Sequence, residues 1–149
     1  MGQLVEQVGN FKYLGTKLIE DGSSMEDVRM RIGMAKNAFS QRTELLSRRM
    51  SRNVKKKIVK TVIWPIALYG CETWTLRIDE IRKLNTLELW LWRKMEGVSW
   101  RDHRKNEGVL NVVQEGVCMV ETIIKRKKRW IGHVLRGGGL MRDVAHTEK

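Results

Sequence analysis

The 149-residue sequence has little proline and cysteine, with one Pro and two Cys, and no long hydrophobic run. A single proline interrupts few helices and favours a helix-rich fold. Cys71 and Cys118 form no Cys-x-x-Cys pair, so we expect free thiols in a reducing compartment. The longest apolar stretch, residues 62–71, is about half the length of a membrane-spanning helix. We therefore expect an intracellular chain, nuclear or cytoplasmic, with no membrane partner.

Residues that could form a catalytic or metal site are also few and dispersed. The five Asp occupy turns, caps or loops and include no Asp-Asp pair, whereas a two-metal site needs converging carboxylates. The spacing of the three His supports neither a Ser-His-Asp nor a Cys-His arrangement. A zinc site would need irregularly spaced ligands, namely Cys71, His103, Cys118 and His133. We predict no catalytic residue, no metal and no cofactor in this chain.

Positive charge, by contrast, is plentiful and unevenly distributed. The formal net charge is +12, from 29 Lys and Arg against 17 Asp and Glu. Residues 41–60 hold eight cations and one Glu, and residues 121–136 hold six cations and one Glu, which leaves 15 cations and 15 anions elsewhere. Two focused clusters indicate a polyanionic partner, nucleic acid first and an acidic membrane surface second. A charge run can also be no more than a solvated helix face.

These two basic clusters contain the residues that we expect to bind nucleic acid. Phosphate contacts need positive charge and carry no sequence information, so no base-reading motif is required. The run "KRKKR" at 125–129 also fits a nuclear-localisation pattern. The predicted phosphate-binding residues are Arg48, Arg49, Arg52, Lys55, Lys56, Lys57, Lys60, Lys125, Arg126, Lys127, Lys128 and Arg129.

Hydrophobic periodicity predicts a mainly α-helical fold, with a short N-terminal β-hairpin and a bundle of about four to five amphipathic helices. The hairpin would pair residues 3–8 with 11–19 across the turn signal Gly9-Asn10. A helix of about 25 residues would follow, with Ser24 and Asp27 as a capping box. Its expected inward residues are Val28, Ile32, Ala35, Phe39 and Leu46.

A second helix is expected after a Ser51 cap, with Pro65 kinking or ending it and Gly70 as a second stop. Its inward face would consist of Val54, Ile58, Val62, Pro65, Ile66 and Tyr69. Asp79 is expected to cap a third helix that runs to about residue 96. Its inward residues would be Ile81, Leu84, Leu87, Leu91 and Met95.

The last helices are a short one over 107–114 and a longer one from about 118 to Gly137. The longer helix is amphipathic, with His133 among the cations of its outer face. Lys127 falls inside the apolar sector, where it must snorkel or meet a ligand phosphate. Its apolar side would hold Val120, Ile123, Ile124, Trp130, Ile131, Val134 and Leu135. Trp64, Trp90 and Trp130 are expected in the core, and Trp100, in a polar loop, is the better candidate for stacking on bases.

Six stretches occur in a fixed order: "FKYLGTKLIEDG", "RIGMAKNAFSQ", "LYGCETWTL", "LELWLWRKMEGVSW", "RDHRKNEGVL" and "KRKKRWIGHVLR". Together they resemble the C-terminal part of the reverse transcriptases of non-LTR (LINE-type) retrotransposons. The likeness covers most of residues 11–136. "LYGCETWTL" and "RWIGHVLR" are its more specific parts, whereas "YLG" alone is weak.

This resemblance implies that "FKYLG" corresponds to the primer-grip hairpin, with Tyr13, Leu14 and Gly15 as the matching positions. The helices that follow would correspond to the thumb, which holds the template–primer duplex. The implied regions are a hairpin remnant of the palm (1–22), a thumb-like helical region (23–97), a loop with a basic C-terminal helix (98–139) and a disordered tail (140–149).

In the parent family, RNA-directed DNA polymerisation uses Mg²⁺ at aspartates of the palm. The palm motif, an endonuclease domain and Cys–His knuckles do not occur in these 149 residues. We therefore expect a truncated, non-catalytic fragment that binds RNA or an RNA–DNA duplex, and that could act with a separate palm-bearing polypeptide. Two alternatives stay open: a decayed or domesticated helical interaction module, and peripheral membrane binding through the last amphipathic helix.

Overall fold

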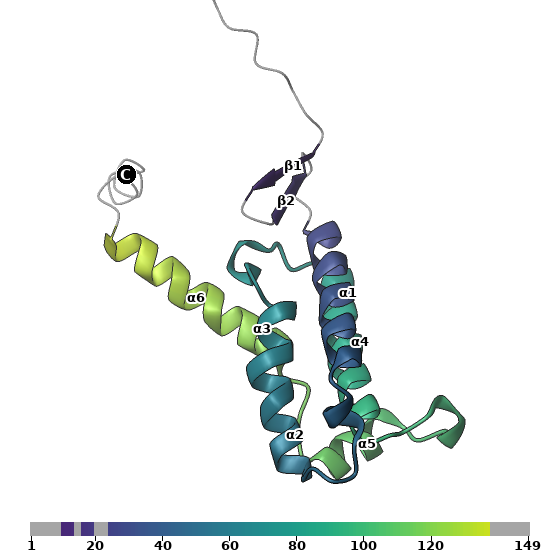
Figure 1. Ribbon diagram of the computed structural model, residues 1–149. Helices are drawn as coiled ribbons and strands as arrows, with labels where there is room; N and C mark the ends of the chain where they lie inside the picture. The colour runs from purple at the N-terminus through teal and green to yellow at the C-terminus, as the bar shows by residue number, and fades with distance from the viewer. Residues whose placement is uncertain (1–9, 14–15, 20–23, 138–149) are drawn as a thin grey trace, which may run out of the picture.

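The computed structural model describes residues 10–13, 16–19 and 24–137 of the chain, and helices account for most of this part (Figure 1). The mainly α-helical class is therefore confirmed. The helices are α1 (Met25–Gln41), α2 (Arg52–Ile58), α3 (Trp64–Ala67), α4 (Ile78–Met95), α5 (Asn106–Val113) and α6 (Met119–Gly137). Short 3₁₀ turns in the connections are Thr43–Leu46, Cys71–Thr73 and Trp100–Asp102.

Two short strands, β1 (Asn10–Tyr13) and β2 (Thr16–Ile19), pair antiparallel, with Tyr13 opposite Thr16. Apart from Asn10, which was predicted to lie in the turn, both strands fall within residues 11–19, the segment predicted as one strand. Its predicted partner, residues 3–8, lies outside the described residues, as does the predicted tail. The predicted hairpin of 3–8 with 11–19, and its role as a remnant of a palm sheet, are therefore not supported. The sequence signal given too little weight is Gly15, because glycine favours a turn between two strand-forming runs.

The start of α1 shows that the predicted capping box is wrong. Ser24 Oγ donates to the carbonyl oxygen of Thr75 at 2.9 Å. Asp27 accepts a hydrogen bond from Trp74 Nε1 at 2.6 Å, and both of these side chains are buried. The two polar residues therefore connect α1 to the segment that precedes α4, instead of capping their own helix.

Helix α1 is also shorter than predicted, because Arg42 leaves the helical conformation with φ −96° and ψ 81°. The 3₁₀ turn that follows changes the phase of the side chains. Leu45 is consequently buried, whereas Leu46, which was predicted to face inward, is 52% exposed.

Helix α2, a π-helical segment (Val59–Ile63) and α3 follow one another without a break (Figure 1). Pro65 has no N–H, and its ring crowds the carbonyl group one turn earlier. The π segment directly before Pro65 is the kind of widened turn that relieves such crowding. The helix therefore passes through Pro65 and ends at Ala67, before Gly70 adopts a left-handed φ of 73°.

The buried face of this long helical segment differs from the predicted one. Val59, Ile63 and Ala67 are buried, whereas Val54, Pro65 and Tyr69, predicted to face inward, are exposed. The reason is that the alkyl stem of a lysine, Lys55, occupies part of the buried arc, and periodicity analysis gives such a position no apolar weight.

The core lies between α1, the α2–α3 segment and α4, and the first turns of α6 complete it (Figure 1). Trp64 and Trp92 lie within it, with ring centroids 6.5 Å apart, and Trp90 packs edge-on against Phe39 at 5.6 Å. On α4, Glu80 accepts from the backbone N–H of Arg77, so Arg77 and not Asp79 is the capping position. Four of the five predicted inward positions of α4 are confirmed, because Leu84, Leu87, Leu91 and Met95 are buried, whereas Ile81 is only partly buried.

Candidate nucleic-acid interface

Arg52, at the start of α2, forms a bidentate ion pair on the surface of the protein. Its Nε and Nη2 donate to the two carboxylate oxygens of Glu96 at 2.6 and 3.1 Å. Such fork-shaped pairs fix both side chains in one geometry. Arg52 therefore joins α2 to the end of α4, and its charge is paired within the chain.

Lys56 and Lys60 share one carboxylate, that of Glu115, at 2.9 and 2.8 Å. Burial alone would raise the pKa of Glu115, but the hydrogen bonds from Lys60 and Lys56, and the charges of both lysines, hold it below its ordinary value. Lys56 also donates to the carbonyl oxygen of Val113, at the end of α5, at 2.9 Å. A cation is favourable there because helix C-termini carry partial negative charge. These two lysines thus attach the α5–α6 connection to α2 and to the π-helical segment that follows it.

The remaining residues of the first cluster divide into buried and exposed. Lys55 is only 8% exposed. Arg48, Arg49 and Lys57 are exposed, and none of them forms an ion pair with an acidic residue in the described part of the chain. The exposed remainder of this cluster is therefore small.

The second cluster lies on α6 and stays largely open to solvent. Lys125, Lys128 and Arg129 are exposed. Lys127 instead donates from Nζ to the carbonyl oxygen of Trp74, so the apolar-sector lysine meets a backbone group of its own chain. Arg126 is half-buried, and its guanidinium lies against the thiol of Cys71. The cations left free on this helix follow each other along its outer side.

A buried carboxylate on α4 holds the start of α6. Glu88 accepts hydrogen bonds from the backbone N–H groups of Cys118 at 3.1 Å and Met119 at 2.8 Å. These are two of the N–H groups at the helix start that have no partner within the helix, and a negative charge is favourable at that end. Met119 and Ile123 enter the core. Helix α6 is therefore anchored by its first turns, and its distal part extends away from the helical body (Figure 1).

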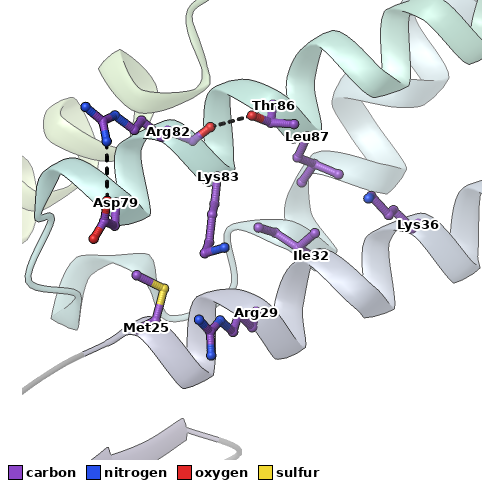
Figure 2. Close-up of a pocket in the computed structure, with 9 residues that line it drawn as sticks. All are labelled: Met25, Arg29, Ile32, Lys36, Asp79, Arg82, Lys83, Thr86 and Leu87. Carbon is purple, nitrogen blue, oxygen red and sulfur yellow. Dashed lines mark hydrogen bonds and ion pairs between the residues drawn. The ribbon is translucent and has the colours of Figure 1, made fainter. Parts of the chain in front are cut away.

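A further cationic groove, which the spacing of charges along the sequence does not predict, lies between α1 and α4 (Figure 2). It has a volume of about 570 Å³. Arg82 pairs with Asp79 at 3.6 Å, and Lys83 extends from α4 toward α1. The groove is lined by Met25, Arg29, Ile32, Lys36, Asp79, Arg82, Lys83, Thr86 and Leu87. Its cations come from two helices that are far apart in the sequence, so only the pairing of these helices reveals the cluster.

Of the predicted primer-grip positions, Tyr13 ends β1, and Leu14 and Gly15 lie outside the described residues. Their predicted role stays a prediction. Trp100 is 78% exposed, with the guanidinium carbon of Arg101 at 5.7 Å from its ring centroid.

The thiols of this chain are poorly suited to nucleophilic chemistry. Both cysteines are free, and burial raises the pKa of each to about 11. For Cys71 the nearby Arg126 lowers the pKa only in part, and for Cys118 the charge of Glu88 raises it further. Since the thiolate is the reactive form, both groups are unreactive at neutral pH. Among the described residues, His, Cys, Asp and Glu side chains form no group of three that could hold a metal ion.

A scan against protein-family models, and searches of curated proteins and of solved structures, give no match to this chain. In the described part of the chain, every helix is too short or too polar to cross a lipid bilayer.

Proposed function

We propose that this chain binds nucleic acid, and that Lys125, Lys128 and Arg129 of α6 contact the phosphates. The observation that supports this most is that these cations are exposed and form no ion pair within residues 24–137. Phosphate contacts position a protein on a strand without reading its bases, so we expect little sequence preference.

Five predicted residues are not retained in this interface because each is paired or buried within the protein: Arg52, Lys55, Lys56, Lys60 and Lys127. Arg48, Arg49, Lys57 and the cations of the α1–α4 groove can add to the positive field that attracts a polyanion. They do not replace direct contacts by α6.

We further propose that the bound nucleic acid is a template–primer duplex, as in the thumb of a LINE-type reverse transcriptase. The support is the resemblance of six ordered motifs. Several residues of these motifs also have structural roles in this fold. In "LYGCETWTL", Gly70 adopts a left-handed conformation, and Trp74 links α1 through Asp27 to α6 through Lys127. The proposed activity is binding alone.

The direct test is a triple neutralisation, Lys125→Gln with Lys128→Gln and Arg129→Gln, in the full chain. Binding to a fluorescent RNA–DNA hybrid would be measured by anisotropy at low salt. We expect the affinity to fall about 10- to 100-fold, because up to three phosphate contacts are lost. The matched control neutralises three other exposed cations, Lys94, Arg101 and Lys105, with the same change in net charge.

Equal losses in both triple variants would mean that only net charge matters, and would contradict a site on α6. An unchanged affinity in both would favour the second candidate, a helical interaction module without specific nucleic-acid function. The observation that favours this candidate is that Arg52, Lys56 and Lys60 form ion pairs with carboxylates of the same chain.

A further inference from the structure

Trp130 is exposed and lies among cations. It is located on the distal part of α6, beyond the buried Ile123, and 46% of its surface is exposed, whereas the sequence predicted a core position. It lines a hollow of about 440 Å³, which we call the Trp130 hollow. The other lining residues are Glu72, Arg126, Arg129, His133 and Arg136.

The indole lies at the border between the apolar stripe of α6 and its cationic side. Trp130 follows Arg126 by four residues and precedes His133 by three, and residues at these spacings are neighbours on a helix surface. Ile131 and Leu135 are exposed as well, but they lie about 100° or more around the helix from Trp130. A partner that covers the indole therefore also meets positive charge.

The other tryptophans do not combine an exposed ring with free neighbouring cations. Trp74 and Trp92 are buried, Trp64 lies in the core, and Trp90 packs against Phe39. Trp100 is exposed, but the guanidinium of Arg101 already faces its ring.

The hollow beside Trp100 also has fewer free cations. Arg93, which lines it, donates to the carbonyl oxygen of Arg104 and to Asn106 Oδ1. The distal end of α6 lies far from the connection between α4 and α5, which carries Trp100 (Figure 1).

We propose that the Trp130 hollow binds an unpaired nucleotide, with the base stacked on the indole and the flanking phosphates held by Arg126 and Arg129. A flat apolar ring next to guanidinium groups matches a nucleotide, which combines a flat base with a negative phosphate. A lipid surface fits less well, because acyl chains would contact Ile131 and Leu135 on another side of the helix. This inference rests on the proposed function and refines it. Phosphates of any strand can bind α6, whereas a base inside a duplex is stacked between its neighbours and has no free face for Trp130.

The test compares Trp130→Ala, Trp130→Phe and the control Trp100→Ala with the wild-type chain. Each protein would be titrated against four ligands: a DNA strand, an RNA strand, an abasic strand with the same number of phosphates, and a blunt duplex. The strands would be about ten nucleotides long and the duplex about ten base pairs. Far-UV circular dichroism checks that every variant keeps its helices, which we expect because Trp130 is half-exposed.

We expect Trp130→Ala to weaken binding of the base-bearing single strands about tenfold, with no change for the abasic strand or the duplex. Trp130→Phe should retain most of the affinity, because it keeps an aromatic face, and Trp100→Ala should have no effect. The slope of affinity against salt should be the same in wild type and Trp130→Ala, because no charge is removed.

An unchanged affinity of Trp130→Ala for the single strands would overturn the stacking site while leaving phosphate binding intact. Equal losses for the abasic and base-bearing strands would also overturn it, since the indole would then act without a base. Loss of binding to vesicles of phosphatidylcholine and phosphatidylserine, with no change for oligonucleotides, would assign the hollow to a membrane. Failure of the wild-type chain to bind any of the strands would refute the proposed function and the stacking site together.

Discussion

The carboxylate of Glu88 holds the start of α6 in place. It is fully buried on α4, and it accepts the backbone N–H groups of Cys118 and Met119. Replacing Glu88 with Ala leaves both donors without an acceptor and leaves a void next to the first turn of α6. Replacing it with Gln keeps the shape and one acceptor oxygen, but removes the charge.

The magnitude follows from the number of hydrogen bonds. A hydrogen bond to a charged group contributes about 1.5–3 kcal/mol, and an unsatisfied buried donor adds to the loss. Removing the carboxylate also removes the cost of burying a charge, which lessens the net effect. We therefore expect Glu88→Ala to lower the free energy of unfolding by about 2–4 kcal/mol, and Glu88→Gln by about 1–2 kcal/mol.

Urea unfolding, followed by tryptophan fluorescence and far-UV circular dichroism, measures these changes. The control is Glu121→Ala, an exposed acidic residue in the first turn of the same helix, which should cost less than about 1 kcal/mol. Hydrogen exchange at the Met119 amide should also accelerate in Glu88→Ala. A loss of less than about 0.5 kcal/mol in Glu88→Ala would refute the view that this carboxylate anchors α6.

Two further expectations concern pH. The pKa of Glu115 lies below its ordinary value of 4.5, so its stabilising effect is present above that value and lost as the pH falls through the lower folded-state pKa. Urea unfolding between about pH 3 and 6 should therefore show a steeper acid loss in wild type than in Glu115→Gln, and identical profiles would count against the pairing with Lys56 and Lys60. The pKa values of Cys71 and Cys118 are raised from 9.0 to about 11, so stability should fall between these pH values, because the unfolded chain releases the protons first. The native thiol of Cys71 should resist iodoacetamide at pH 8, and its rapid alkylation would show that it is not buried as described.

The sequence predicted the elements of the fold better than their details. Strong apolar spacing located α4 and the start of α6, because a helix with one buried side repeats every three to four residues. Helix ends depended on single residues whose partners are distant in sequence. Ser24 and Asp27 resemble a capping box until Thr75 and Trp74 are known to lie next to them. The continuation through Pro65 depends on a π segment, for which periodicity has no signal.

The candidate site was harder to predict, because charge density says nothing about where a charge is neutralised. Lys60 looks free until Glu115, 55 positions later, is placed beside it. Lys125 and Arg129 have no such partner among the described residues. Trp130 borders both sides of α6, and its apolar spacing predicts a core position only if the helix is covered along its whole length. Only the first turns of α6 are covered by the other helices, because Met119 and Ile123 are buried whereas Trp130 is exposed.

The most direct test of the central claim, that α6 contacts phosphates, is the salt dependence of binding. The affinity of the wild-type chain for an RNA–DNA hybrid would be measured over a series of potassium chloride concentrations. Three phosphate contacts correspond to a slope of about −3 in a plot of the logarithm of the binding constant against the logarithm of salt concentration. We expect that slope or a steeper one, reduced by about 2 to 3 in the triple variant of α6. An affinity that hardly changes between low and physiological salt would contradict the claim.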